Sequence, residues 1–229
     1  MSRTSNHKNR AAFFDLDLTL TQKDCFRLFL KSIYLTRISG LTRMSGFVYL
    51  PYLAYLLILR KSRLISLRAF KERSLIMLKG LTQGRITALG NLFFQHRIKP
   101  MLRRKALEKI QWHKCRGDRI FVISASPDIY VQAVCEFLGC DDYACTRLAY
   151  DNGKFTGHIT GPDCLGQEKE TFIHALAKWH KIDLTTSSAY SDHESDLPFF
   201  ESFGKKVAVS PTPTLEQVAL SKNWEIVKW

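Results

Sequence analysis

Two aspartates separated by one residue end the first apolar stretch of the chain. The segment Ala11 to Thr21 reads AAFFDLDLTLT, so Asp15 and Asp17 follow four apolar residues and precede Thr19. An apolar run this short that ends at a charge predicts a buried parallel strand, and ligands of open α/β sheets lie at the carboxyl ends of such strands. Because two buried carboxylates repel each other, the pair predicts a hard cation such as Mg²⁺, which would also attract a phosphate.

Three further segments place polar groups in similar positions. Ser124 ends the apolar run RIFVIS, where a hydroxyl beside the backbone amides of a following helix can hold a phosphoryl oxygen. Lys169 begins a predicted helix and can neutralise a phosphate or a carboxylate. In YSDHESDLPFF, Asp192 can complete the metal site, and Asp196 can orient the lysine or a metal-bound water. Each has an ordinary alternative, because the serine and these aspartates also suit helix caps and the lysine suits a solvated surface.

The elements that must position these residues alternate between strands and helices in two parts of the chain. After the first strand the alternation resumes at Arg119 and continues to Val227, whereas the long stretch between them has only helical patterns. We therefore predict an α/β fold with a three-layer, Rossmann-like parallel sheet. Its core would comprise residues 1–22 and 116–229, and residues 23–115 would form an inserted α-helical cap.

One segment of the predicted cap is apolar on every helical face. It runs from Phe47 to Leu59 as FVYLPYLAYLLIL, well short of the roughly 20 residues that a bilayer span needs. Basic residues flank it, namely Arg37, Arg43, Arg60, Lys61 and Arg63. We favour a helix buried in the cap, and the alternative is a segment that rests among anionic headgroups with its cations extended outward.

The composition is that of a globular protein with a basic surface. The chain has 229 residues, 45% of them hydrophobic, and a formal net charge of +13, which argues against disorder and favours anionic partners. Its six cysteines form no Cys-x-x-Cys pair, and the polar amino terminus has no secretory pattern. We therefore expect free thiols and a cytoplasmic location, with peripheral contact at the cytoplasmic face of the inner membrane as an extension.

Four segments, taken in order, resemble the motifs of haloacid dehalogenase-like phosphatases, and the resemblance covers nearly the whole chain. They are FDLDLTLT, the apolar strand that ends at Ser124, GQEK and YSDHESD. The long insertion after the first motif resembles subfamily IB, the phosphoserine phosphatase-like members. Leu18 departs from the pattern, since many members have a small residue there. The predicted cap and the residues around the motifs also resemble those of bacterial phosphatidylglycerophosphatases of the C type.

The resemblance implies a Mg²⁺-dependent phosphomonoesterase that works through an aspartyl-phosphate. Asp15 would attack phosphorus, and Asp17 would protonate the leaving oxygen and then activate water. Mg²⁺ would be held by the Asp15 carboxylate, the Asp17 carbonyl and Asp192. Ser124 and Lys169 would bind the phosphoryl oxygens.

The resemblance gives supporting places to three more residues. Asp196 would support the metal shell, and Thr19 belongs to the first motif. In similar phosphoserine phosphatases, an acid at the position of Asp24 contacts the substrate amine. Here we expect Asp24 to cap the first cap helix instead.

Three functions remain open from the sequence. The first is a phosphatase for a lipid phosphate such as phosphatidylglycerophosphate, which the basic, apolar cap favours. The second is a soluble phosphatase for a small metabolite such as phosphoserine. The third is a non-catalytic protein that binds an anionic membrane or RNA through the cap, although the complete motif set argues against it and no nucleic-acid partner is expected.

Overall fold

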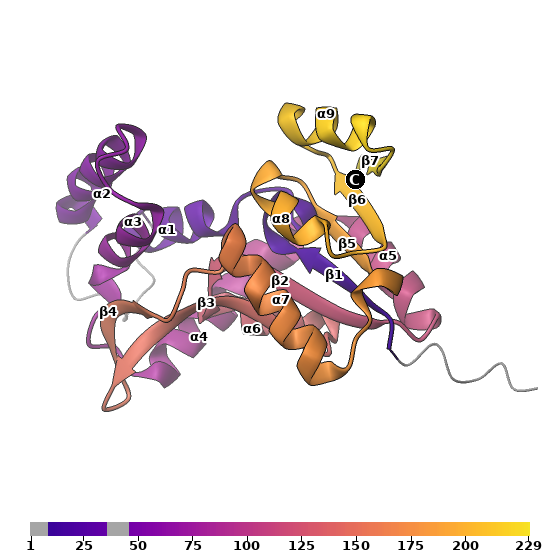
Figure 1. The fold of residues 1–229 in the computed structure, drawn as a ribbon. Helices are drawn as coiled ribbons and strands as arrows, with labels where there is room; N and C mark the ends of the chain where they lie inside the picture. The colour runs from indigo at the N-terminus through magenta and orange to yellow at the C-terminus, as the bar shows by residue number, and fades with distance from the viewer. Residues whose placement is uncertain (1–8, 36–45) are drawn as a thin grey trace, which may run out of the picture.

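A seven-stranded sheet crosses the protein in a computed structural model that describes residues 9–35 and 46–229 (Figure 1). The strand order is β4-β3-β2-β1-β5-β6-β7, and neighbours run parallel except β3 and β4, which are antiparallel. The strands are β1 (Ala11–Asp15), β2 (Arg119–Pro127), β3 (Asp142–Asp151), β4 (Lys154–Thr160), β5 (Ser188–Ser191), β6 (Lys205–Val209) and β7 (Glu225–Val227). The predicted α/β class with a largely parallel sheet is confirmed.

Helices cover both faces of this sheet and give the three layers. Side chains alternate along a strand, so Ala12 and Phe14 of β1 join one core cluster while Ala11 and Phe13 join the other. The first cluster lies under α5 and α6, and the second lies under α7, α8 and α9. These helices are α5 (Arg104–Cys115), α6 (Asp128–Leu138), α7 (Gln167–His180), α8 (Leu197–Phe200) and α9 (Pro213–Ser221).

Strand β1 lies in the middle of the sheet, so all five of its residues are buried. Phe13 stacks on Phe121 of β2 with ring centroids 4.6 Å apart, and Phe14 stacks on Tyr190 of β5 at 4.5 Å. The strand register aligns the same residues as neighbours. Asp15 therefore emerges at the carboxyl edge of the sheet, between the ends of β2 and β5.

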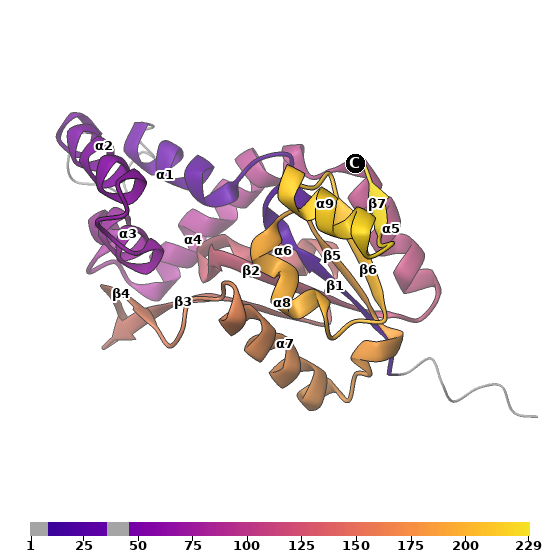
Figure 2. The ribbon, with the colours of Figure 1, turned by 45° about the horizontal axis from the view of Figure 1, so that its top comes forward.

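The insertion between β1 and β2 contains most of the helices at one end of the molecule. Figures 1 and 2 show α1, α2 and α3 grouped beyond the carboxyl end of β1. The inserted elements before α5 are α1 (Cys25–Leu35), α2 (Gly46–Lys61), α3 (Leu67–Ser74), η2 (Ile76–Leu78), α4 (Gln83–Phe93), η3 (Phe94–Ile98) and η4 (Lys99–Met101). Helix α5 instead packs on the sheet, where His113 contacts the Tyr190 hydroxyl at 2.8 Å. We therefore propose that the cap extends from α1 to η4 and that α5 belongs with the core.

Helix α2 contains the apolar segment for which we favoured burial, and that prediction is wrong for much of its described surface. Leu56 is fully buried, but Tyr55, Leu57 and Ile58 are 54%, 50% and 64% exposed. The segment is apolar on every side, whereas the contacts of α2 among the described residues are with α1 and α3, and its side chains from residue 51 onward are mostly exposed or half-buried. Arg37 and Arg43 lie outside the described residues. Within the described part of the chain, no helix is long and apolar enough to cross a bilayer.

Helix α4 joins the insertion to the core through a very close helix contact. A Cβ atom added at Gly90 would lie 1.6 Å from the carbonyl oxygen of Ile129 on α6. The side chains of Ile86, Leu89 and Phe93 on α4 are buried around this point. The backbones of the two helices therefore meet where only a glycine fits.

We expect Gly90→Ala to lower the free energy of unfolding by about 2–4 kcal/mol, because the added methyl group forces α4 away from α6. Gly84→Ala is the matched control, since it lies on the same helix and its added Cβ meets nothing within 4 Å. We expect that control to be neutral or to stabilise by up to about 1 kcal/mol. Urea unfolding measures both variants, and equal effects would contradict the close contact.

Candidate active site

The predicted site residues meet at the carboxyl ends of β1, β2 and β5, around a cavity of about 250 Å³. Six of them line this cavity: Asp15, Asp17, Asp24, Lys169, Asp192 and Asp196. Ser124 and Thr19 do not line it but are fully buried and contact residues that do. Leu67 and Lys71 of α3 and Phe26 of α1 add walls from the insertion.

The turn after β1 directs both motif aspartates into the cavity. This turn, η1 (Leu16–Leu20), has Leu18 in the left-handed region with φ of 60°. That conformation costs a residue with a Cβ atom about 1–2 kcal/mol, so glycine would adopt it more readily than leucine. The Leu18 amide donates to the Thr21 hydroxyl at 3.3 Å, and the Thr21 amide donates to the Leu16 carbonyl at 3.1 Å. The departure at Leu18 is therefore accommodated by a braced turn.

A buried lysine links two of the carboxylates. The Lys169 ammonium, in the first turn of α7, donates to Asp15 Oδ1 and to Asp196 Oδ2, both at 2.6 Å. Asp196 ends η6 (Glu194–Asp196), and its Oδ2 also accepts from the Ser191 hydroxyl at 2.5 Å. The lysine is 2% exposed, so the solvated-surface alternative does not describe it.

Burial and like charge shape the protonation of this cluster. Burial raises the pKa of Asp15 well above its usual value; Lys169 opposes this, whereas Asp196, Asp192 and Asp17 add to it. Burial acts to lower the pKa of Lys169, but the attraction of Asp15 and Asp196 outweighs it, so the pKa is raised and the ammonium persists. Burial raises the pKa of Asp192 to about 6 despite the hydrogen bond from Thr19. The site therefore carries more acid than its lysine neutralises.

This donor set suits a hard divalent cation. Asp15 ends β1 and Asp192 follows the neighbouring strand β5, where the Thr19 hydroxyl donates to its Oδ1 at 3.0 Å. Asp196 Oδ1 is buried without a hydrogen-bond partner among the described residues. In the described part of the chain, no group of three or more Asp, Glu, His or Cys side chains is arranged so that side chains alone could hold a metal ion. A cation here would complete its shell with a backbone carbonyl and water, as Mg²⁺ commonly does.

Asp17 is held from two sides. Its Oδ1 accepts from the backbone amide of Cys25 at 2.5 Å, and its Oδ2 accepts from the Ser126 hydroxyl at 2.7 Å. The Ser124 hydroxyl is 3.5 Å from the same Oδ2 and accepts from the Ser126 amide at 3.0 Å. Burial raises the pKa of Asp17, and the charge of Asp24 adds to the shift. Ser124 lies within β2, whereas α6 begins four residues later, so Ser124 does not cap that helix.

Asp24 performs the capping that we predicted for it. Its Oδ1 accepts from the backbone amide of Arg27 at 2.8 Å, which satisfies a free donor in the first turn of α1. Its carboxylate also lines the cavity near Asp17.

Two residues at the site were not singled out from the sequence. Ser126 had a usable signal, because residues two apart on a strand lie on one face and Ser124 was already a candidate. Lys71, on α3, had none. It is 3% exposed and donates to the Ala125 carbonyl at 2.6 Å and to Asp163 at 2.5 Å, so the insertion contacts both the end of β2 and the loop that follows β4.

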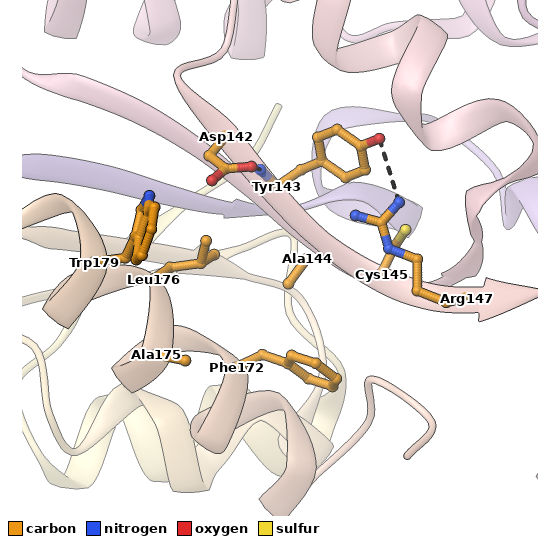
Figure 3. A pocket seen from close by; sticks show the side chains of 9 residues that line it. All are labelled: Asp142, Tyr143, Ala144, Cys145, Arg147, Phe172, Ala175, Leu176 and Trp179. Carbon is orange, nitrogen blue, oxygen red and sulfur yellow. Dashed lines mark hydrogen bonds between the residues drawn. The ribbon is translucent and has the colours of Figure 1, made fainter. Parts of the chain in front are cut away.

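A second pocket of about 390 Å³ lies elsewhere, between β3 and α7 (Figure 3). Phe172, Leu176 and Trp179 of α7 make much of its wall. Arg147 is directed to the Tyr143 hydroxyl at 3.4 Å, as the dashed line in Figure 3 shows. None of the Asp15 cluster lines this pocket, so the convergent charges place the candidate site at the first cavity.

Comparison with known proteins gives one family and several relatives. The family model described as haloacid dehalogenase-like hydrolase matches residues 12–201. A phosphoserine phosphatase of Mycobacterium tuberculosis is 27% identical over 94% of this chain and 70% of its own length. A solved protein of unknown function from Bordetella pertussis has a TM-score of 0.84 at 22% identity, covering 96% of this chain and 98% of that one. A phospho-aspartyl intermediate analogue of phosphoserine phosphatase has a TM-score of 0.66 at 22% identity, covering 96% and 93%.

We expect Lys169→Met to lower the free energy of unfolding by about 3 kcal/mol, because Asp15 and Asp196 would remain buried without their cation. Lys178→Met is the matched control, since Lys178 is exposed on the same helix and should change stability by no more than about 0.5 kcal/mol. Urea denaturation of both variants measures the difference. A Lys169→Met variant as stable as the control would contradict the proposed strength of the pairing.

Proposed function

Because the chain belongs to the haloacid dehalogenase-like hydrolase family and is a hydrolase of phosphoric monoesters, we propose that it is a Mg²⁺-dependent phosphatase that forms an aspartyl-phosphate on Asp15. The observation that supports this most directly is the Asp15 carboxylate 2.6 Å from the buried Lys169 ammonium, in one cavity with Asp17 and Asp192. An acid at that position can act as a nucleophile whose charge is matched, beside a second acid for proton transfer.

The reaction has two halves. An oxygen of Asp15 attacks phosphorus while the ester P–O bond breaks, and the bonding pair leaves with the alcohol oxygen, which takes the proton of Asp17. Asp17, now a carboxylate, removes a proton from water as that water attacks phosphorus. The P–O bond to Asp15 then breaks, its electron pair returns to the Asp15 carboxylate, and inorganic phosphate leaves.

The other residues keep the phosphoryl group in place. Lys169 and Ser124 bind phosphoryl oxygens, and Asp196 keeps the lysine oriented through its 2.6 Å contact. Mg²⁺, held by the Asp15 carboxylate, the Asp17 carbonyl and Asp192, would supply neutralisation of the phosphoryl charge. The acid excess described above supports this assignment.

For the substrate we propose a lipid phosphate such as phosphatidylglycerophosphate, met at an anionic membrane surface. Leu57, Ile58 and Leu64 are 50%, 64% and 72% exposed, and Arg60, Lys61 and Arg63 lie beside them. Apolar side chains bordered by cations suit the boundary between acyl chains and anionic headgroups. Helix α2 packs on α3, which walls the cavity, so contact through α2 would bring lipid headgroups near the site.

The second candidate is a soluble substrate such as phosphoserine. The relative from M. tuberculosis bears the name of that activity, and Asp24 places an acid at the cavity wall. This candidate predicts turnover that is independent of vesicles.

We expect Asp15→Asn to reduce phosphatase activity to below about a thousandth of wild type, because an amide cannot form the acyl phosphate. The variant should stay folded, with a melting temperature within about 5 °C of wild type. Wild-type activity should vanish with EDTA and return with Mg²⁺. Asp151→Asn, at an exposed aspartate that ends β3, is the matched control and should keep full activity. An active Asp15→Asn variant would overturn the nucleophile assignment.

We expect the protein to float with phosphatidylglycerol vesicles, to remain behind with phosphatidylcholine vesicles, and to prefer phosphatidylglycerophosphate over phosphoserine. Replacing both Leu57 and Ile58 by Gln should weaken vesicle binding at least about tenfold, because two exposed apolar side chains are lost. Leu220→Gln, at a 65% exposed residue on α9, is the control and should not change binding. Full activity on phosphoserine without vesicle binding would favour the soluble candidate.

A further inference from the structure

The carboxyl of Asp17 is fixed by hydrogen bonds from two different parts of the molecule. The Cys25 amide that donates to Oδ1 is at the start of α1, and the Ser126 hydroxyl that donates to Oδ2 is near the end of β2. The 2.7 Å contact from Ser126 is much shorter than the 3.5 Å separation from Ser124. Ser126 is therefore the side chain that fixes the plane of the Asp17 carboxyl.

Ser126 is itself oriented by a neighbour. The Tyr130 hydroxyl donates to Ser126 Oγ at 2.9 Å, and both side chains are almost completely buried. Tyr130 packs against Phe29 and Phe93, with ring centroids 5.6 and 5.2 Å away, so its position is fixed by the insertion. Because a serine hydroxyl has one proton and Tyr130 donates to its oxygen, that proton is directed to Asp17.

The two serines near the end of β2 therefore have different surroundings. Ser124 Oγ accepts from the Ser126 amide at 3.0 Å and donates to Asp17 Oδ2 at 3.5 Å, the limit of hydrogen bonding. Its proton is therefore held only weakly by the described residues and can turn to a phosphoryl oxygen. The proton of Ser126 is already used. A shared role in phosphate binding does not fit both residues.

We propose that Ser126, oriented by Tyr130, is a positioning residue that holds the Asp17 carboxyl in line with the leaving ester oxygen. The inference rests on the function proposed above, in which Asp17 delivers the proton to that oxygen. Loss of the Ser126 hydroxyl lets the carboxyl rotate about its side-chain bonds, so protonation of the leaving group suffers while phosphate binding is unchanged.

The leaving group separates this role from a structural one. An alkoxide is a poor leaving group and needs the proton of Asp17, whereas a nitrophenolate departs without it. The ratio kcat/KM covers the steps up to loss of the alcohol, so later water attack does not enter the comparison. A defect confined to alkyl esters therefore reports on proton delivery.

The experiment measures kcat/KM with Mg²⁺ for glycerol phosphate, an alkyl ester, and for p-nitrophenyl phosphate. We expect Ser126→Ala to lose at least about tenfold on the alkyl ester and less than about threefold on the nitrophenyl ester. Tyr130→Phe should show the same bias with a smaller loss, and Ser126→Thr should restore the alkyl ester rate. Ser124→Ala, on the same strand, should lose a similar factor on both esters.

Equal losses on the two esters in Ser126→Ala and Tyr130→Phe, or no loss in either, would overturn the inference. Where Ser126→Ala fails to fold by circular dichroism, Tyr130→Phe and Ser126→Thr decide on the same ratio. A wild-type protein that hydrolyses neither ester with Mg²⁺ would instead refute the proposed function, and this inference would fall with it. Active wild type with unbiased variants leaves that function intact and rejects only the role of Ser126.

Discussion

The structure depends above all on the buried ammonium of Lys169 between Asp15 and Asp196. Removing three charges from water is costly, and the cost is offset only when short contacts and hydrogen bonds replace hydration. The two 2.6 Å contacts and the Ser191 hydroxyl provide that replacement. They join the ends of β1 and β5 to the start of α7, so the arrangement that solves an electrostatic problem of folding also assembles the candidate chemistry.

The insertion contacts the core at several places, among them a polar contact near the cavity and a close helix contact away from it. Near the cavity, the buried Lys71 joins α3 to the Ala125 carbonyl and to the partly buried Asp163. Away from it, Gly90 lets α4 approach the backbone of α6. Attachment at both places limits how far the walls of the cavity can separate without breaking buried contacts.

The core was predictable because its signals are local. AAFF before Asp15 is typical of a strand buried on both faces of a parallel sheet, and all five residues of β1 are buried. The carboxyl ends of β1, β2 and β5 then meet by topology alone.

The features that the sequence did not predict depend on contacts between residues far apart in the chain. Burial of α2 depends on how many other elements pack around it. A segment that is apolar on every face does not indicate which of its faces will be covered. Lys71 reaches Asp163 across 92 positions of the chain, a contact that no local pattern signals. Ser126 lies two positions from the candidate Ser124. Its role, however, depends on the hydrogen bond from Tyr130, which is known only once the positions of the two hydroxyls are known.

Because one of the two hydrogen bonds to the Asp17 carboxyl comes from the insertion, the position of the insertion affects the orientation of that carboxyl. One of its carboxyl oxygens is governed by the first amide of α1 and the other by the end of β2, two regions that become neighbours only when the protein is folded. In the proposed mechanism, a substitution that tilts α1 would misalign the Asp17 carboxyl without contacting the substrate. With the role proposed for Asp17, alignment of its carboxyl would restrict which substitutions these helices accept, even at positions that do not contact the substrate.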